Sequence, residues 1–179
     1  MAELTPEFSR PVRLDILGDL PHPMDITADV AERAALVRRF RIVALDRLEA
    51  TAALKRTGDR VEVTGRIVAN AVQACVASGE DVPEKIDQPF VLRFVPEAEA
   101  GIDSADEEIE LGEAALDEVG YSGSAVDLGE AVAQTLALAL NPYPRAPNAE
   151  EALRAAGVKI EGEEEKLGAF AALKELLKK

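Results

Sequence analysis

Hydrophobic and polar residues alternate along the middle of this chain, which is the pattern of strands with one buried face. Leucine and alanine take every second position over residues 48–54, and valine does so after the turn sequence Thr57-Gly58-Asp59. A second turn, at residues 78–81, leads into a third alternating stretch that ends near residue 95. Since the connections are this short, we predict three long strands in an antiparallel meander, which could curl into a half-barrel.

Apolar residues at three- and four-residue spacing predict two helices, over residues 30–39 and 128–140. Each is preceded by an aspartate with a glutamate three positions later, the capping-box sequence that satisfies free N–H groups at a helix start. The first helix ends in arginines, which the helix dipole favours, and Asn141-Pro142 ends the second. We expect both helices to pack on the sheet. The capping pairs are Asp29 with Glu32 and Asp127 with Glu130.

Weaker signals predict short elements around this framework. Residues 7–15 predict a first strand, with Pro11 marking an edge or a strand start, and residues 24–27 predict another short strand. A bulge or bend is expected in the second long strand, near Gly65 or Ala69–Ala71.

The predicted elements define an α+β fold in a single domain that covers residues 1–141. Within it, residues 97–125 are expected to form an acidic connection, with no structure beyond a short strand at Ile109–Leu111. Residues 142–179 are expected to form a linker and a C-terminal helix, because apolar residues fall along one stripe over residues 164–177.

The composition excludes several classes of protein. With no Trp and 4% aromatic residues, the chain lacks the stacking platforms of single-strand nucleic-acid binders. A single cysteine allows no internal disulfide. The N-terminus lacks the features of a signal peptide, and the longest helix-like apolar run is too short to cross a bilayer. We therefore expect a cytoplasmic protein with no membrane association.

The net charge of −14 is concentrated in one segment. Residues 96–130 carry 12 acidic and no basic side chains, whereas the rest of the chain carries 22 acidic and 20 basic ones. Residues 97–118 could form an acidic arm that repels phosphate backbones and attracts a basic partner. The alternative is a solvated loop that aids solubility. The candidate residues of the arm are Asp103, Asp106, Glu107, Glu108 and Glu110.

The basic residues of the first half are mostly arginines, whose planar guanidinium suits paired contacts with phosphate or carboxylate groups. Some of them follow the first predicted helix and others lie on the predicted strands. The alternative is that they are ordinary surface charges, dispersed over the molecule. The candidates for contact with RNA or a protein partner are Arg38, Arg39, Arg41 and Arg66.

No constellation of residues typical of an enzyme is visible. The only histidine, His22, lies between two prolines in a predicted turn, where a general base would be poorly oriented. One histidine and one cysteine cannot assemble a common zinc site, and no glycine-rich phosphate-binding loop is present. We therefore expect a non-enzymatic protein without a metal, a cofactor or a small-molecule substrate.

Cys75 allows two interpretations. A small apolar side chain at a strand end needs no function once it is buried. A reactive thiol would need a basic or helix-N-terminal setting to lower its pKa, and the neighbours Ala74, Val76 and Ala77 offer none. The sequence favours the structural interpretation.

The strand and turn GRIVANAVQACVASGEDVPEKIDQPF is followed by the acidic region and by AVDLGEAVAQTLALALNPYPRAP. In this order the segments resemble the YceD family of bacterial and plastid proteins, described as large ribosomal RNA subunit accumulation proteins. The start EFSRPVRLD and the closing GAFAALKELLKK also resemble members of this family. The resemblance therefore extends over nearly the whole chain.

This chain departs from the cysteine pattern of that family. Many members carry C-x-x-C after the strand and further cysteines after the late helix. Here Cys75 matches the first position, Ser78 stands at the second, and NPYPRAPNAEE contains no cysteine. The resemblance is therefore to a metal-less branch, whose turn must be held by packing and hydrogen bonds.

The resemblance implies a role in the accumulation of large-subunit ribosomal RNA, without a known enzymatic activity. The implied partners are that RNA or a basic ribosomal protein. A net charge of −14 conflicts with direct RNA binding, which is driven by phosphate neutralisation. A neutral body could contact RNA while the acidic arm binds a basic ribosomal protein. The alternative is an acidic adaptor or chaperone that binds a basic protein without contacting RNA.

Overall fold

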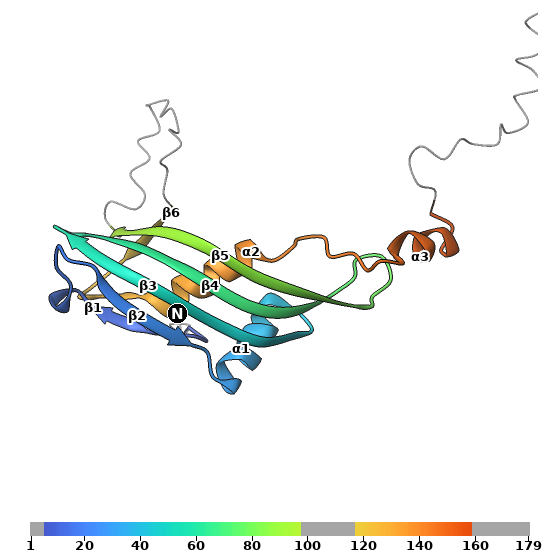
Figure 1. The fold of residues 1–179 in the computed structure, drawn as a ribbon, viewed down its shortest axis with the longest axis horizontal. Helices are drawn as coiled ribbons and strands as arrows, with labels where there is room; N and C mark the ends of the chain where they lie inside the picture. Colours follow the sequence, from blue (N-terminus) through green and yellow to red (C-terminus); the bar gives the residue numbers. More distant parts are fainter. Residues whose placement is uncertain (1–5, 98–116, 159–179) are drawn as a thin grey trace, which may run out of the picture.

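The computed structural model describes residues 6–97 and 117–158, and its main feature is an open sheet of five strands (Figure 1). The strands lie in the order β2-β3-β4-β5-β6, and neighbours from β2 to β5 run antiparallel. The α+β class and the meander of three long strands are therefore confirmed, without closure into a barrel. The strands are β2 His22–Thr27, β3 Ala44–Thr57, β4 Arg60–Ala74, β5 Asp81–Pro96 and β6 Asp117–Tyr121.

Both turns of the meander contain a glycine in the left-handed region. Gly58, between β3 and β4, has φ 64°, and Gly79, between β4 and β5, has φ 74°. A glycine adopts this conformation without the steric cost of a Cβ atom. In β4, buried residues alternate with exposed ones from Val61 onward, so the period of two correctly predicted the buried face.

The bulge lies on β3 and not on β4. The register of β3 and β4 shifts between Leu45 and Arg47, whereas β4 and β5 pair without a shift. The shift lies opposite Asn70 and Ala71, so the expected position near Ala69–Ala71 was right along the ladder but wrong about the strand, since the extra residue belongs to β3.

Two further strands lie in the region expected to be an acidic connection. β6 pairs in parallel with the end of β5, and β7 Ala125–Asp127 pairs antiparallel with β1 Pro11–Arg13 in a separate small sheet. The expectation that residues 97–125 form only a connection was therefore wrong over residues 117–121 and at Ala125, where β7 begins. Strands of three and five residues are too short to show a clear alternation of hydrophobic and polar residues. They are recognised only by their pairing with other strands.

The strand expected over residues 7–15 is also shorter than predicted. β1 covers three residues and is followed by a 3-10 turn, η1 Leu14–Ile16. Pro11 is its first residue, in agreement with the expected strand start.

Helices α1 Val30–Phe40 and α2 Leu128–Ala139 begin where the capping sequences predicted. At α1 the capping box is complete, with Asp29 and Glu32 each accepting from the other's N–H group. At α2 Asp127 accepts from the N–H of Glu130, but the Glu130 side chain binds Arg39 instead of closing the box. The tertiary contact with Arg39 therefore takes the place of the hydrogen bond by which the Glu130 side chain would complete the capping box.

One aliphatic core joins both helices to the sheet. Leu36 of α1, Ile67 of β4 and Leu136 of α2 are fully buried in the same cluster. The apolar positions of α2 that recur every four residues, from Leu128 to Leu140, all belong to it. Within the described ranges, no polar or charged side chain is buried.

The expected linker contains a short third helix, α3 Ala149–Ala155. The C-terminal helix expected over residues 164–177 and the strand expected at Ile109–Leu111 lie outside the described residues. Among the helices of residues 6–97 and 117–158, none is long and apolar enough to cross a bilayer.

Candidate functional site

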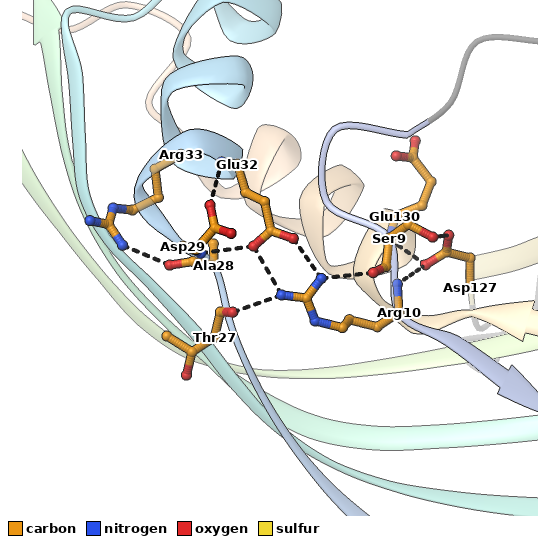
Figure 2. A network of polar contacts seen from close by, with 9 residues as sticks. All are labelled: Ser9, Arg10, Thr27, Ala28, Asp29, Glu32, Arg33, Asp127 and Glu130. Atoms are coloured by element: carbon orange, nitrogen blue, oxygen red, sulfur yellow. Dashed lines mark hydrogen bonds and ion pairs between the residues drawn. The ribbon is translucent and has the colours of Figure 1, made fainter.

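A network of polar contacts around Arg10 joins the first segment of the chain to the start of α1 (Figure 2). Its guanidinium donates to both carboxylate oxygens of Glu32, at 2.6 and 2.9 Å, and to the carbonyl oxygens of Ser9 and Thr27, at 2.7 and 3.0 Å. Glu32 also accepts from the N–H of Asp29, so the same carboxylate completes the helix cap. The hydrogen bond from Arg10 lowers the pKa of Glu32.

Asp127 holds the start of α2 to the same segment (Figure 2). Its carboxylate accepts from the Ser9 hydroxyl at 2.5 Å, from the Arg10 N–H at 2.8 Å and from the Glu130 N–H at 3.1 Å. Both helix starts are therefore fixed by the two residues that precede β1. This network positions the helices, and through α1 it positions the arginines at the end of that helix.

Arg39 is bound by two carboxylates and is not available as a free cation. It donates to Glu130 at 2.6 and 2.8 Å and to Glu7 at 2.9 Å. The hydrogen bond with Glu130 is the main cause that raises the pKa of Arg39, and it lowers the pKa of Glu130. Of the three arginines predicted here as contacts, Arg38 and Arg41 are exposed and pair with no described carboxylate.

Arg66 lies on the opposite face of the sheet from α1. Its neighbour Ile67 points into the core shared with the helices, whereas the Arg66 side chain is 54% exposed. The Arg66 guanidinium donates to Asp87 of β5 at 2.6 Å. The structure therefore does not bring Arg66 together with Arg38 and Arg41.

The outer face of the sheet carries charges in alternation. Lys55, Glu62, Arg93 and Glu118 stand directly opposite one another on β3, β4, β5 and β6. Such cross-strand pairs neutralise each other and stabilise the sheet. The outer face is therefore close to neutral and does not resemble a phosphate-binding surface.

Most arginines of the described part are in fact paired. The exposed pairs contribute little stability, but they reduce the positive field that a nucleic acid would meet. The pairs are Arg10–Glu32, Arg13–Asp15, Arg39–Glu130, Arg47–Glu49, Arg56–Asp59, Arg66–Asp87 and Arg93–Glu118.

Cys75 lies at a junction between the β4–β5 turn and the segment that precedes α3. Its side chain is 3% exposed and packs against Ala146 and Ala149. The N–H of Ala146 donates to the Cys75 Sγ at 3.2 Å, and that of Ser78 does so at 3.4 Å. Next to it, the N–H of Val76 donates to the carbonyl of Pro144. The turn is thus held by packing and hydrogen bonds.

These contacts change the electrostatics of the thiol. The N–H of Ala146, followed by the Ser78 contact, lowers the pKa of Cys75 to about 6, although burial of the thiol opposes the shift. The neighbours Ala74, Val76 and Ala77 were expected to offer no basic or helix-N-terminal setting, and the lowered pKa comes instead from N–H hydrogen bonds. The main donor, Ala146, is 71 positions away in the sequence.

The junction does not fit a metal ion. A structural zinc site needs four nitrogen or sulfur ligands, and here Ser78 stands where a second thiol would be required and turns its N–H toward Cys75. Within residues 6–97 and 117–158, no three His, Cys, Asp or Glu side chains are grouped to hold a metal.

Sequence reasoning missed the contact between Cys75 and residues 144–149. Neither spacing nor periodicity relates these segments; the only signal was the resemblance, which places family cysteines at both. The candidate residues of the acidic arm lie outside the described residues: Asp103, Asp106, Glu107, Glu108 and Glu110.

Comparison with known proteins gives one match. The model of a family described as large ribosomal RNA subunit accumulation protein YceD matches residues 63–177, which is more than half of the chain. No curated protein and no solved structure matches the chain.

Proposed function

This chain belongs to the YceD family of large ribosomal RNA subunit accumulation proteins, and from this membership we propose that it is a non-enzymatic factor in large-subunit biogenesis. It would act in the cytoplasm and support the accumulation of large-subunit ribosomal RNA. The observation that carries this proposal is the family match over residues 63–177, which covers most of β4, the later strands β5, β6 and β7, and helices α2 and α3.

The charges of the chain support contact through a protein more than contact through RNA. Most described arginines are paired with carboxylates, and residues 97–118 contain no basic residue. Direct RNA binding depends on lysine and arginine side chains that release counterions from phosphates. We therefore expect a basic ribosomal protein to be the main partner, with Arg38 and Arg41 as the candidates for a limited RNA contact.

Deletion of the gene tests the proposal. Large-subunit precursor and mature RNA should fall relative to small-subunit RNA, and a plasmid copy of the full chain should restore them. Unchanged levels of both RNAs in the deletion strain would contradict the proposed function.

An acidic adaptor or chaperone that never contacts RNA is the second candidate, and the paired arginines favour it. Filter binding of large-subunit RNA across a salt series separates the two. A steep fall of affinity with salt indicates phosphate contacts, whereas no binding at low salt leaves the adaptor.

A further inference from the structure

A groove of 510 Å³ is lined by β5, the start of β6 and α2. Two large apolar side chains at this groove are open to solvent: Leu138 of α2 is 80% exposed and Val91 of β5 is 40% exposed. Glu118 is the only ionisable side chain among the described residues that line it. A second apolar surface that covered these side chains would be held there by removing both surfaces from water.

The groove is open because β6 is short. β6 pairs only with residues 92–96 of β5, so no described strand pairs with this edge of β5 from Pro83 to Val91. Pro83 and Pro89 have no N–H, and both belong to the odd-numbered residues of β5, whose backbone groups turn away from β4. An added strand would therefore lack a donor at each proline, whereas a helix forms its backbone hydrogen bonds internally. The groove favours a helix as its occupant.

The polar side chains of the groove do not select a charged occupant. Its single carboxylate is already paired, so the lining offers no free charge that would attract an acidic or a basic segment. The groove therefore fits a helix whose contact face is apolar. The polar contacts on its walls are Glu118 with Arg93, Gln134 with Glu130, and Thr135 with the carbonyl oxygen of Ala131.

One segment of the chain that lies outside the described residues has such a face in its sequence. Residues 164–177 are expected to form a helix, and they carry three glutamates and two lysines, so the segment is nearly neutral. The family match over residues 63–177 covers this segment together with every residue that lines the groove. The apolar stripe of the segment consists of Leu167, Phe170, Leu173 and Leu177.

The described chain ends near the groove. α3 is held beside the beginning of β5, because Ala149 belongs to the small cluster that packs against Val82. The N–H of Asn141 donates to the carboxylate of Glu84, two residues further along β5. Leu138 is one helical turn before Asn141, so it lies about 11 Å from the level of Val82.

The chain beyond α3 is long enough for this distance. From Ala149 to Val158 the chain adds at most about 14 Å if it points away from the groove. Residues 159–163 span up to about 20 Å when extended, and a helix over residues 164–177 is about 21 Å long. Such a helix can therefore reach the groove and run beside α2 in the opposite direction.

We propose that residues 164–177 of this same chain dock in the groove as a helix, with their apolar stripe against Leu138. Because the segment is tethered close to the groove, its effective concentration is on the order of millimolar, and a modest apolar contact suffices to hold it there. A partner protein that used this groove would have to displace the chain's own helix. This docking goes beyond the proposed function and does not depend on it.

Disulfide formation in the full-length chain tests the docking. Cys75 is the only cysteine, so Cys75→Ala provides a background without thiols. In it, Leu138→Cys with Leu173→Cys should form a disulfide within one chain under mild oxidation, detected by intact mass and by mobility on a non-reducing gel. The matched control is Leu20→Cys with Leu173→Cys, which should stay reduced, because Leu20 is 81% exposed but lies in the loop before β2.

Hydrogen exchange of the full-length chain with Cys75 retained provides a second measurement. Phe170→Lys removes an apolar contact and adds a charge, so amides in the last turn of α2 should exchange about tenfold faster. Ala172→Lys, on the opposite side of the expected helix, should leave the exchange of these amides unchanged. Equal exchange in the two variants would contradict the docking.

The docking and the proposed function fail separately. Equal disulfide yields for the two cysteine pairs would overturn the docking. A disulfide between two chains, seen as a dimer on the gel, would also overturn it and would assign the groove to a second copy. Neither result changes the level of large-subunit RNA expected after gene deletion, which tests the proposed function alone.

Discussion

Arg10 and Glu32, which are 22 positions apart, form a two-pronged ion pair that ties the first segment of the chain to the cap of α1. The Glu32 carboxylate takes part in the pair and in the capping box at the same time. Arg10 therefore supports both the local cap of α1 and the long-range contact between the first segment of the chain and this helix.

Arg10→Ala should lower the free energy of unfolding by about 2 kcal/mol, because hydrogen bonds to a charged partner are lost and Glu32 is left half-buried. Urea unfolding measures the difference. Arg13→Ala is the control: it removes the exposed pair with Asp15 and should cost no more than about 0.5 kcal/mol. If both variants lost the same free energy of unfolding, the Arg10 network would contribute no more to stability than the exposed pair of Arg13.

The effect of Arg10→Ala should also depend on pH. Arg10 lowers the pKa of Glu32 below its ordinary value of 4.5, so the stabilisation is present above that value. It is lost as pH falls through the lowered folded pKa, because Glu32 is then protonated in both states. Unfolding curves of the two chains should therefore converge in acid and separate toward neutral pH; a constant gap at all pH values would contradict this assignment.

The Cys75 thiol should titrate near pH 6 in the folded chain and in its ordinary range, near 9.0, in denaturant. Thiolate absorbance at 240 nm measures both. Because the folded pKa is the lower one, the thiolate stabilises the fold above pH 9 and this contribution is lost as pH falls toward 6. Cys75→Ala should remove this pH dependence; a folded thiol that titrates near 9 would contradict the hydrogen bonds from Ala146 and Ser78.

Gly65→Ala should destabilise the sheet by about 1–3 kcal/mol, the usual cost of overpacking. A Cβ atom at this position would lie 2.5 Å from the carbonyl oxygen of Thr51 and 2.6 Å from the Phe90 ring. Gly18→Ala is the matched control, because a Cβ there meets nothing within 4 Å. Thermal unfolding of both variants measures the difference, and similar melting temperatures would show that β4 can shift to accept the methyl group.

If Arg38 and Arg41 contact RNA phosphates, neutralising both should reduce the slope of log affinity against log salt by about 1–2. The variant is Arg38→Ala with Arg41→Asn, since Arg41 has φ 56° and asparagine tolerates this conformation. Arg47→Ala with Arg66→Ala, which removes two paired arginines, should leave the slope nearly unchanged. Equal slopes for all chains would remove this end of α1 from RNA contact.

The long elements were predictable because each carries its own repeated signal. The alternation over β3, β4 and β5, and the four-residue spacing from Leu128 to Leu140, arise from burial of one face, and burial was observed on those faces. The capping aspartates marked both helix starts because the cap is a local hydrogen bond.

The candidate arginines were identified correctly as surface residues, but their partners could not be read from the sequence. Arg39 is bound by Glu130, which is 91 positions away in the sequence. Arg66 of β4 is bound by Asp87 of the neighbouring strand β5. The sequence does not show that an arginine is paired when its carboxylate partner lies far away in the chain.

By itself, then, the sequence determined the α+β class, the three-stranded meander, the two capped helices, the family and the acidic segment, because all of these are written in local pattern and order. Only the tertiary structure decided that β6 stops short and leaves the edge of β5 open, that the Ala146 N–H donates to the Cys75 Sγ, and that most arginines are paired with carboxylates. Each of these depends on segments distant in sequence meeting in space, and no local pattern records such a meeting.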